Sequence, residues 1–173
     1  MAKEARIEPY LKRLFGYAFS LARDHHRAED LVQECALRAL TARNTPVDEP
    51  AYKTWLFRIL KNAFVDRLRR ERTAADHLID AGGAHDMEFW QGDERFITTL
   101  TVKIEIEKLP PPQQEILGLI DIAGLSYAEA GQFLGVPIGT VMSRISRARR
   151  ALLEAVASSN VHELPVKKKK GMR

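Results

Sequence analysis

Cysteine is nearly absent from this chain of 173 residues, and it has no long hydrophobic run at all. The single cysteine, Cys35, excludes an internal disulfide and a cysteine-rich zinc module, and is typical of a reducing compartment. No apolar run approaches the roughly 20 residues that a membrane-spanning helix needs, and residues 1–18 carry too many charges for a signal peptide. The sequence therefore predicts a cytoplasmic protein without membrane insertion.

Motifs of common enzyme sites are missing as well. The sequence contains no P-loop, no dinucleotide-binding glycine pattern and no serine nucleophile elbow. His25 and His26 are adjacent, so on a helix they diverge by about 100° and are poorly placed to share a metal ion. Cys35 lies on an apolar helical stripe, which favours a small core residue. We therefore predict no enzymatic activity, no cofactor and no metal.

Charge is present in separate blocks. The net charge is only +4, and hydrophobic residues at 45% with charged residues at 29% are values of a globular protein. Residues 53–72 hold seven basic and two acidic residues, and residues 138–173 hold nine basic and two acidic ones. Between them, residues 73–137 hold eleven acidic and three basic residues. Two basic blocks separated by an acidic one indicate two surfaces that face a polyanion.

The first half of the chain has the periodicity of helices. Apolar residues recur at steps of three and four over Glu4–Ala22, over residues 28–39 and over Tyr52–Glu71. Pro46 and Pro50 indicate a loop before the third helix, which we place over residues 44–51. Trp55 falls on the apolar side of this helix, which favours a place in the core over a role as a strand-opening wedge.

The second half is also helical, after an acidic, glycine-bearing stretch whose Phe89-Trp90 and Phe96-Ile97 indicate short helical pieces. A helix is predicted over Gln113–Ala123, followed by Gly124 and by a capping box from Ser126 to Glu129. A last helix is predicted from about residue 138 to residue 157. The overall prediction is an all-α fold of two small helical domains, 1–72 and 104–157, joined by a flexible acidic linker, 73–103, and followed by a basic, disordered tail, 158–173.

The short capped helix, the turn and the longer basic helix have the sequence form of a helix-turn-helix. At about 100° per residue, Val141, Ile145, Ala148 and Leu152 share the inward side of the last helix. The outward side carries hydroxyl and guanidinium groups and no carboxylate before Glu154, which suits the DNA major groove. These outward residues are Ser143, Ser146, Arg147 and Arg150. Gly139 and Thr140 lie in the first turn, where free backbone N–H groups favour a phosphate.

Several of these segments resemble the conserved regions of bacterial sigma factors. Residues 28–34 (AEDLVQE) and 54–59 (TWLFRI), followed by Asn62, resemble the second region. Residues 124–129 (GLSYAE) and 139–149 (GTVMSRISRAR) resemble the fourth region. A chain with only these two regions and a variable linker resembles the extracytoplasmic-function (ECF) group of the sigma-70 family. The resemblance covers roughly residues 5–72 and 104–155.

The resemblance implies a dissociable specificity subunit of RNA polymerase, which directs promoter-specific transcription initiation and typically serves a stress response. Region two would read and melt the promoter −10 element, and region four would read the −35 element as duplex. The implied partners are promoter DNA, the clamp coiled coil and flap of core RNA polymerase, and an anti-sigma factor. When bound to polymerase, the protein would lie at the nucleoid.

The resemblance also assigns residues. Asn62 would line the pocket for a flipped −10 base, and Tyr52 and Lys53, with the loop before them, would close that pocket. The remaining −10 residues would serve the phosphate backbone: Arg58, Lys61, Arg67, Arg69 and Arg70. The −35 residues would be Gly139, Thr140, Met142, Ser143, Arg144, Ser146, Arg147 and Arg150. The polymerase-binding residues would be Asp30, Gln33, Glu34 and Arg38, which share one polar helix face.

The sequence departs from the family pattern at Met142, where an arginine is common, so that one −35 contact would become an apolar contact with a thymine methyl group.

Two other functions remain open. One is a sigma-mimicking module that sequesters an anti-sigma factor, although the intact basic face argues against a protein that has no need of DNA. The other is a helix-turn-helix regulator without polymerase, which leaves the resemblance of residues 28–62 unexplained.

Overall fold

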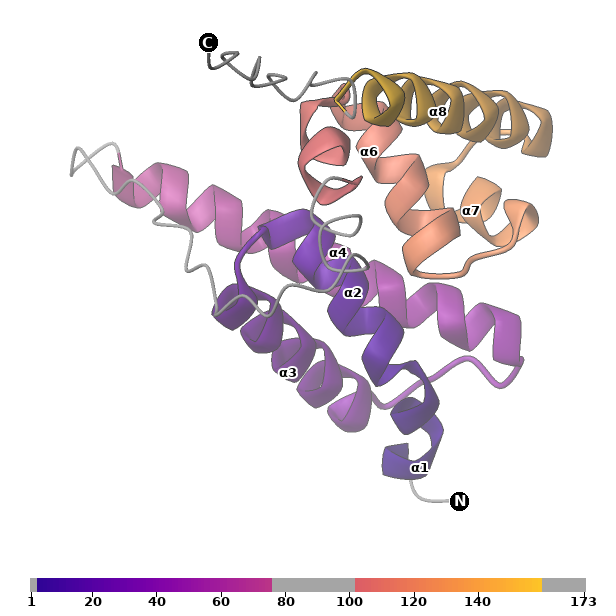
Figure 1. Cartoon of the computed structure of the whole chain (residues 1–173). Helices are drawn as coiled ribbons and strands as arrows, with labels where there is room; N and C mark the ends of the chain where they lie inside the picture. The colour runs from indigo at the N-terminus through magenta and orange to yellow at the C-terminus, as the bar shows by residue number, and fades with distance from the viewer. Residues whose placement is uncertain (1–2, 76–101, 160–173) are drawn as a thin grey trace, which may run out of the picture.

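The protein is all-helical, as predicted. A computed structural model describes residues 3–75 and 102–159, and all of their regular secondary structure is helical, with no strand in these two ranges. The long helix α4 (Glu49–Ala75) crosses the middle of the molecule. The earlier helices lie on one side of it and the helices after residue 102 lie on the other (Figure 1).

The first group of helices begins with a break that the sequence prediction missed. The predicted single helix Glu4–Ala22 is wrong: α1 (Lys3–Ile7) gives way to a 3₁₀ turn (Glu8–Tyr10) before α2 (Leu11–Ala22). Pro9 lies in this turn and has no backbone N–H to continue an α-helical ladder, so the chain tightens there. A third helix, α3 (His25–Thr41), follows and is capped by the Asp24 side chain, which accepts a hydrogen bond from the Arg27 N–H at 2.7 Å.

Helix α4 is longer than predicted at both ends. It begins at Glu49 rather than Tyr52, because the Asp48 carboxylate accepts the Ala51 N–H at 3.0 Å and so caps the helix earlier. Pro50 then lies in the first turn, where an α-helix needs no N–H, and does not end the loop as we expected. The connection between α3 and α4 is thereby shortened to residues 42–48.

The second group contains the helix-turn-helix. Residues 102–108 are helical, followed by α6 (Pro111–Leu117), one π-helical turn η2 (Gly118–Ile122), α7 (Tyr127–Leu134) and α8 (Ile138–Ser159). The predicted capping box is confirmed, because Ser126 and Glu129 exchange backbone-to-side-chain hydrogen bonds at 2.6 and 3.2 Å. The turns on either side of α7 contain Gly124 and Gly135, whose φ angles of 68° and 67° favour glycine.

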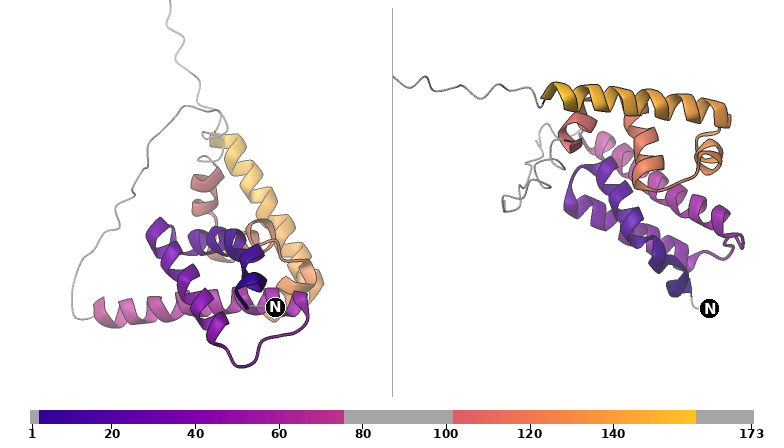
Figure 2. Two further views of the ribbon diagram at one scale, coloured as in Figure 1. Left: turned by 90° about the horizontal axis from the view of Figure 1, so that it is seen from below. Right: turned by 45° about the vertical axis from the view of Figure 1, so that its right-hand side comes forward.

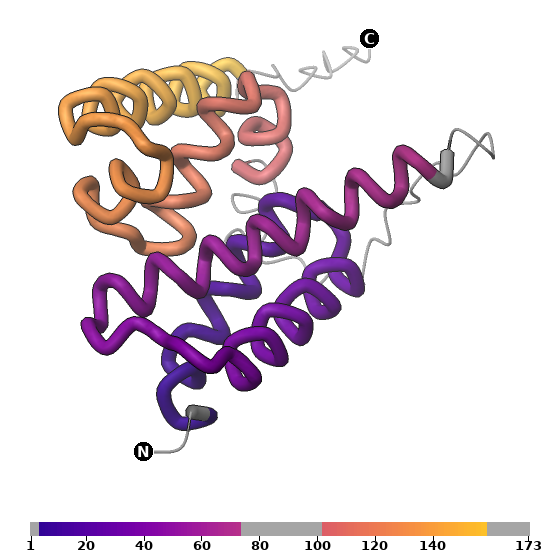
Figure 3. Tube along the Cα trace, turned by 180° about the vertical axis from the view of Figure 1, so that it is seen from behind, coloured from indigo at the N-terminus to yellow at the C-terminus, as the bar shows by residue number. Residues whose placement is uncertain are grey.

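The two groups pack directly on each other. Helix α2 meets η2 so closely that a Cβ atom on Gly16 would lie 2.9 Å from the Ile122 Cγ2. Helix α4 contacts α7, while α8 lies on the side of the molecule farthest from α3 (Figures 2 and 3).

The buried apolar core contains Cys35, as the sequence predicted. Its thiol donates to the Leu56 carbonyl at 3.4 Å, and burial raises the pKa of this thiol to about 12.

Some sequence predictions fall outside the part of the chain that the structure describes. These are most of the acidic linker, with Phe89-Trp90 and Phe96-Ile97, and the basic tail with its four consecutive lysines. Within the two described ranges, no helix combines the length and hydrophobicity needed to cross a membrane.

Candidate nucleic-acid and polymerase interfaces

The outer face of α8 is cationic and open. Val141, Ile145 and Ala148 are buried and Leu152 is partly buried, which confirms the predicted inward side of the helix. Met142, Ser143, Ser146, Arg147 and Arg150 are exposed on the opposite side, and Gly139 is exposed in the first turn. Thr140 and Arg144 are partly buried at the edges of this face. The exposed groups of α8 can therefore reach a duplex without a rearrangement of the helix.

Two neighbouring arginines of α8 point in different directions. The Arg149 guanidinium binds Asp121 of η2 with donor–acceptor distances of 2.5 and 3.3 Å, and this carboxylate raises the pKa of Arg149 above its ordinary value. The Arg147 Nε instead donates to the Ser143 carbonyl one turn back, at 3.2 Å, on the exposed side of the helix. The helix thus uses one arginine to join α8 to η2 and keeps the other on its outer surface.

The residues that were predicted to bind the −10 element divide into two sets along α4. Asn62, Arg69 and Arg70 are exposed. Lys53 and Lys61 are instead partly buried against the second helical group, and Arg58, although exposed, donates a hydrogen bond to that group. A base or phosphate can reach the first set directly, whereas at the second set it competes with intramolecular partners, most of all at the partly buried Lys53 and Lys61.

The contact between Lys53 and Glu129 is the most buried of these. Lys53 Nζ lies 2.8 Å from a Glu129 carboxylate oxygen and donates to the Gly124 carbonyl at 3.0 Å, and both side chains are largely hidden from solvent. Burial alone would raise the pKa of Glu129, but hydrogen bonds from Lys53 and from the Ser126 N–H outweigh it and lower the pKa below its usual value of 4.5. The carboxylate is therefore charged at neutral pH.

Two further contacts extend this seam, the contact surface between α4 and the segment α6–α7. Arg58 Nη2 donates to the Gln132 carbonyl at 3.1 Å, and Lys61 forms an ion pair with Glu115. Lys61 Nζ also lies 5.4 Å from the centroid of the Phe133 ring, a cation–π contact. Sequence reasoning missed this seam, although the opposite charges of residues 53–72 and 73–137 were a signal for it.

Tyr52 and Trp55 lie with the core rather than on the surface. Tyr52 is only 3% exposed, and its ring packs against Trp55 with 5.6 Å between the centroids. Trp55 is partly buried against the same core cluster, as the sequence predicted. In this arrangement the Tyr52 side chain does not face solvent, so it supports neighbouring residues instead of presenting its own ring to DNA.

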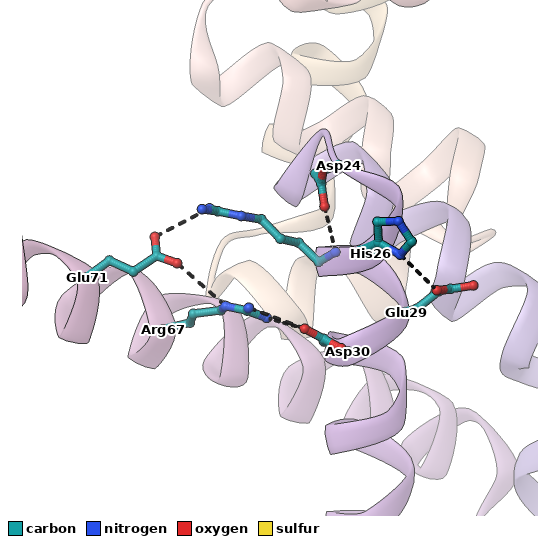
Figure 4. A network of polar contacts seen from close by, with 7 residues as sticks. Asp24, His26, Glu29, Asp30, Arg67 and Glu71 are labelled. Atoms are coloured by element: carbon teal, nitrogen blue, oxygen red, sulfur yellow. Dashed lines mark hydrogen bonds and ion pairs between the residues drawn. The ribbon is translucent and has the colours of Figure 1, made fainter. Parts of the chain in front are cut away.

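The outer face of α3 carries charged side chains that are already engaged with α4. Arg67 donates to a single Asp30 oxygen from both terminal nitrogens, each at 3.3 Å, and its Nε lies 3.6 Å from Glu71 (Figure 4). Arg38 pairs with Glu34 at 2.5 Å and lies 3.9 Å from Asp66, while Gln33 is exposed. Arg67, a predicted −10 residue, thus orients Asp30, a predicted polymerase contact.

The two histidines before this face take part in ordinary helix contacts. His25 Nε2 lies 3.2 Å from one oxygen of Glu29. His26 Nδ1 lies 3.7 Å from the other oxygen (Figure 4). Within residues 3–75 and 102–159, no three His, Cys, Asp or Glu side chains form a group that could hold a metal ion.

The fold and these surfaces define a two-part helical DNA-binding protein with a helix-turn-helix in its second part. Family models agree with the two parts: sigma-70 region 2 matches residues 6–74, and sigma-70 region 4 matches residues 105–152. The chain is 34% identical to the ECF RNA polymerase sigma factor EcfG of Rhodopseudomonas palustris over 139 residues, which cover 80% of this chain and 76% of that protein. It is 38% identical to the ECF sigma factor SigC of Mycobacterium tuberculosis over 134 residues, 73% and 68% of the two chains.

Two solved structures share the fold. The Bartonella quintana sigma factor RpoE, crystallised with the anti-sigma factor NepR, superimposes with a TM-score of 0.62 at 30% identity, covering 92% of this chain and 98% of that one. CnrH in complex with the cytosolic domain of CnrY gives a TM-score of 0.64 at 25% identity, covering 90% and 88%. The chain belongs to the sigma-70 family of bacterial RNA polymerase sigma factors, in its ECF group. It is a non-enzymatic initiation factor that binds core RNA polymerase and directs transcription from specific promoters.

Proposed function

We propose that this sigma factor reads its promoter with two separate surfaces and acts in the cytoplasm. The −35 surface is the exposed side of α8 around Met142, Ser143 and Arg147. The −10 surface is α4 around Asn62, together with the loop of residues 42–48 that precedes the helix. The polymerase surface is the outer side of α3, where Asp30, Gln33, Glu34 and Arg38 lie.

The proposal rests on a difference between the arginines of α8, since one of them binds a carboxylate of the protein and two exposed ones do not in the described ranges. Arg149 is held by Asp121, while Arg147 and Arg150 stay on a face whose first carboxylate is Glu154. Arginine on an exposed helix face, with serines beside it, matches the donors that duplex bases and phosphates accept. From residue 138 to residue 153, α8 has no carboxylate on any side, so no acidic group of this helix competes with DNA for these arginines.

Tethered DNA cleavage tests the assignment of the two surfaces. Because Cys35 is buried, a cleavage reagent can be attached selectively to a cysteine introduced at Met142 or at Asn44, which are both exposed. We expect holoenzyme carrying Met142→Cys to cut promoter DNA around −35 and holoenzyme carrying Asn44→Cys to cut around −10. Cuts from both positions at the same element would contradict the assignment.

The seam between α4 and α6–α7 must open before the −10 surface is complete. In the closed arrangement, with the two helical groups packed on each other, Lys53 and Lys61 form ion pairs with Glu129 and Glu115, so these two cations are not available to phosphates, and Arg58 spends one donor on the Gln132 carbonyl. We propose that an anti-sigma factor is a partner of this chain and prefers the closed arrangement. The solved complexes of RpoE with NepR and of CnrH with CnrY support such a partner.

Neutralising two acidic residues of the seam should strengthen binding of the −10 strand. Glu115→Gln with Glu129→Gln removes the charges that hold Lys61 and Lys53, while a glutamine at position 129 can still accept the Ser126 N–H in the capping box. Because apparent affinity scales with the fraction of open molecules, we expect binding of a single-stranded −10 oligonucleotide to tighten about three- to tenfold. Fluorescence anisotropy with purified protein measures this change.

A matched control removes two negative charges away from the seam. Glu107→Gln with Glu154→Gln changes exposed carboxylates and the net charge by the same amount. If this control tightens −10 binding as much as the seam variant does, general charge rather than opening explains the gain. Equal affinity of the seam variant and the unchanged protein would also contradict the role of the seam.

A further inference from the structure

The loop between α3 and α4 is held by a side chain from the first helix. Arg6 of α1 donates from its two terminal nitrogens to the Pro46 and Val47 carbonyls, each at 2.8 Å. Its Nε and one terminal nitrogen also reach a Glu49 carboxylate oxygen, at 3.3 and 3.1 Å. One guanidinium thus joins two consecutive loop carbonyls to the first residue of α4.

Aromatic residues complete this clamp. The Arg6 guanidinium carbon lies 3.8 Å from the centroid of the Tyr52 ring, so the ring stabilises the guanidinium group through a cation–π contact. Tyr10 donates from its hydroxyl to the other Glu49 oxygen at 2.5 Å, and its ring meets the edge of Tyr52. The hydroxyl of Tyr10 and the guanidinium of Arg6 lower the pKa of Glu49, so the carboxylate stays charged at neutral pH.

The clamp leaves one apolar side chain pointing outward. Val47 is 93% exposed although its own carbonyl is fixed by Arg6, and Asp48 beside it is occupied in capping α4. The Val47 side chain contributes nothing to the core. Its backbone is nevertheless fixed, because Arg6 donates hydrogen bonds to the carbonyls of Pro46 and Val47. Val47 therefore presents a fixed apolar side chain just before α4, the helix that carries Asn62. Such a side chain can contact the apolar edge of a base, above all a thymine methyl group.

We propose that Arg6 is a positioning residue for −10 recognition, which holds the loop of residues 42–48 so that Val47 contacts a base of the −10 element. The proposal rests on the assignment of α4 and this loop to the −10 surface. Arginine suits the task because its planar fork binds two carbonyls and a carboxylate at once, whereas the single ammonium group of lysine cannot reproduce that geometry.

The test compares base preference rather than activity alone. Holoenzymes with Arg6→Lys, Tyr10→Phe and Val47→Thr transcribe a set of templates in which each base of the −10 element, the −35 element and the spacer of one active promoter is replaced in turn. Val47→Thr keeps the shape of an exposed side chain but replaces a methyl group by a hydroxyl, so the fold is unaffected. We expect this variant to change the preferred base at a single −10 position by roughly three- to tenfold.

Arg6→Lys should flatten discrimination at that same position by a similar factor. Tyr10→Phe should flatten it less, since only the hydroxyl contact with Glu49 is lost. Amide hydrogen exchange at residues 47–49 should accelerate in Arg6→Lys, because the loop opens more often. Binding of a −35 duplex and of core polymerase should not change in any of the three variants.

Two results would overturn the proposal. If Arg6→Lys lowers transcription equally from all templates and Val47→Thr changes no preference, Arg6 only stabilises the fold. If Val47→Thr changes preference outside the −10 element, the assignment of the loop itself is wrong. The variant Asn62→Ala separates these cases: a −10 defect in Asn62→Ala with an unchanged profile in Val47→Thr overturns the positioning role and leaves the −10 surface in place.

Discussion

Replacement of Asn62 by alanine should slow promoter opening by about 10- to 100-fold, the range expected when one base-reading contact is lost. Asn62 is exposed on α4, and its amide can donate to and accept from the edge of a base that has left the helical stack. An alanine leaves that base edge unpaired. Permanganate reactivity of unpaired thymines in the holoenzyme–promoter complex measures the rate.

The affinity for core polymerase should be the same in Asn62→Ala as in the unchanged protein, because the polymerase surface lies on α3. Asn62→Asp is the matched variant, because it keeps the size of the side chain. It replaces the amide donor by a negatively charged oxygen. We expect it to be at least as defective as Asn62→Ala. Weaker core binding in either variant would mean that Asn62 serves the polymerase interface or the fold instead of the −10 element.

Arg147→Ala should weaken binding of a −35 duplex by about 1–3 kcal/mol, or roughly 5- to 150-fold, if the guanidinium grips a guanine with two hydrogen bonds. The arginine lies on the exposed side of α8, and its hydrogen bond to the Ser143 carbonyl leaves other donors of the guanidinium available. Electrophoretic mobility shift with the duplex at a fixed salt concentration measures the affinity.

Arg149→Ala provides the control from the same helix. It removes the same charge, but Arg149 is bound to Asp121, so we expect it to make no contact with the duplex. We expect a loss of stability of at most about 1 kcal/mol, because the ion pair is partly exposed, and a −35 affinity within about twofold of the unchanged protein. Equal losses of affinity in the two variants would show that only net charge matters on α8.

Local signals in the sequence were sufficient for the helix-turn-helix. Ser126 and Glu129 form a capping box because their spacing alone places each side chain at the other's backbone N–H. Gly124 and Gly135 end their segments with positive φ angles, which few other residues adopt without strain. The apolar stripe of α8 fixed its inward face through helix geometry, so the exposed cations were also predictable.

Helix boundaries were less predictable, because the effect of a proline depends on its position. Pro9 lies in the 3₁₀ turn that separates α1, which ends at Ile7, from α2. Pro50 stands in the first turn of α4, where its missing N–H costs nothing once Asp48 supplies the cap. Both prolines follow a glutamate in the sequence, and the Asp48 cap before Pro50 is what separates the two outcomes.

Contacts between distant parts of the chain could not be derived from local patterns. Lys53 pairs with Glu129 and Arg6 clamps the Val47 carbonyl only after the helices have packed. Composition had shown that basic and acidic blocks alternate, but not which residues meet. The consequence for the site is direct: three cations predicted to bind DNA are bound to the second helical group in the closed arrangement.

Mapping of transcript start sites tests the central claim, that two cationic helical surfaces of one chain each recognise one stretch of a promoter. Purified protein and core polymerase would transcribe genomic DNA, and the 5′ ends of the transcripts would be sequenced. We predict discrete start sites that share two upstream sequence elements at a constant spacing, with the upstream element lost as a determinant in Arg147→Ala. Start sites that share a single element, or no specific initiation at all, would contradict the account.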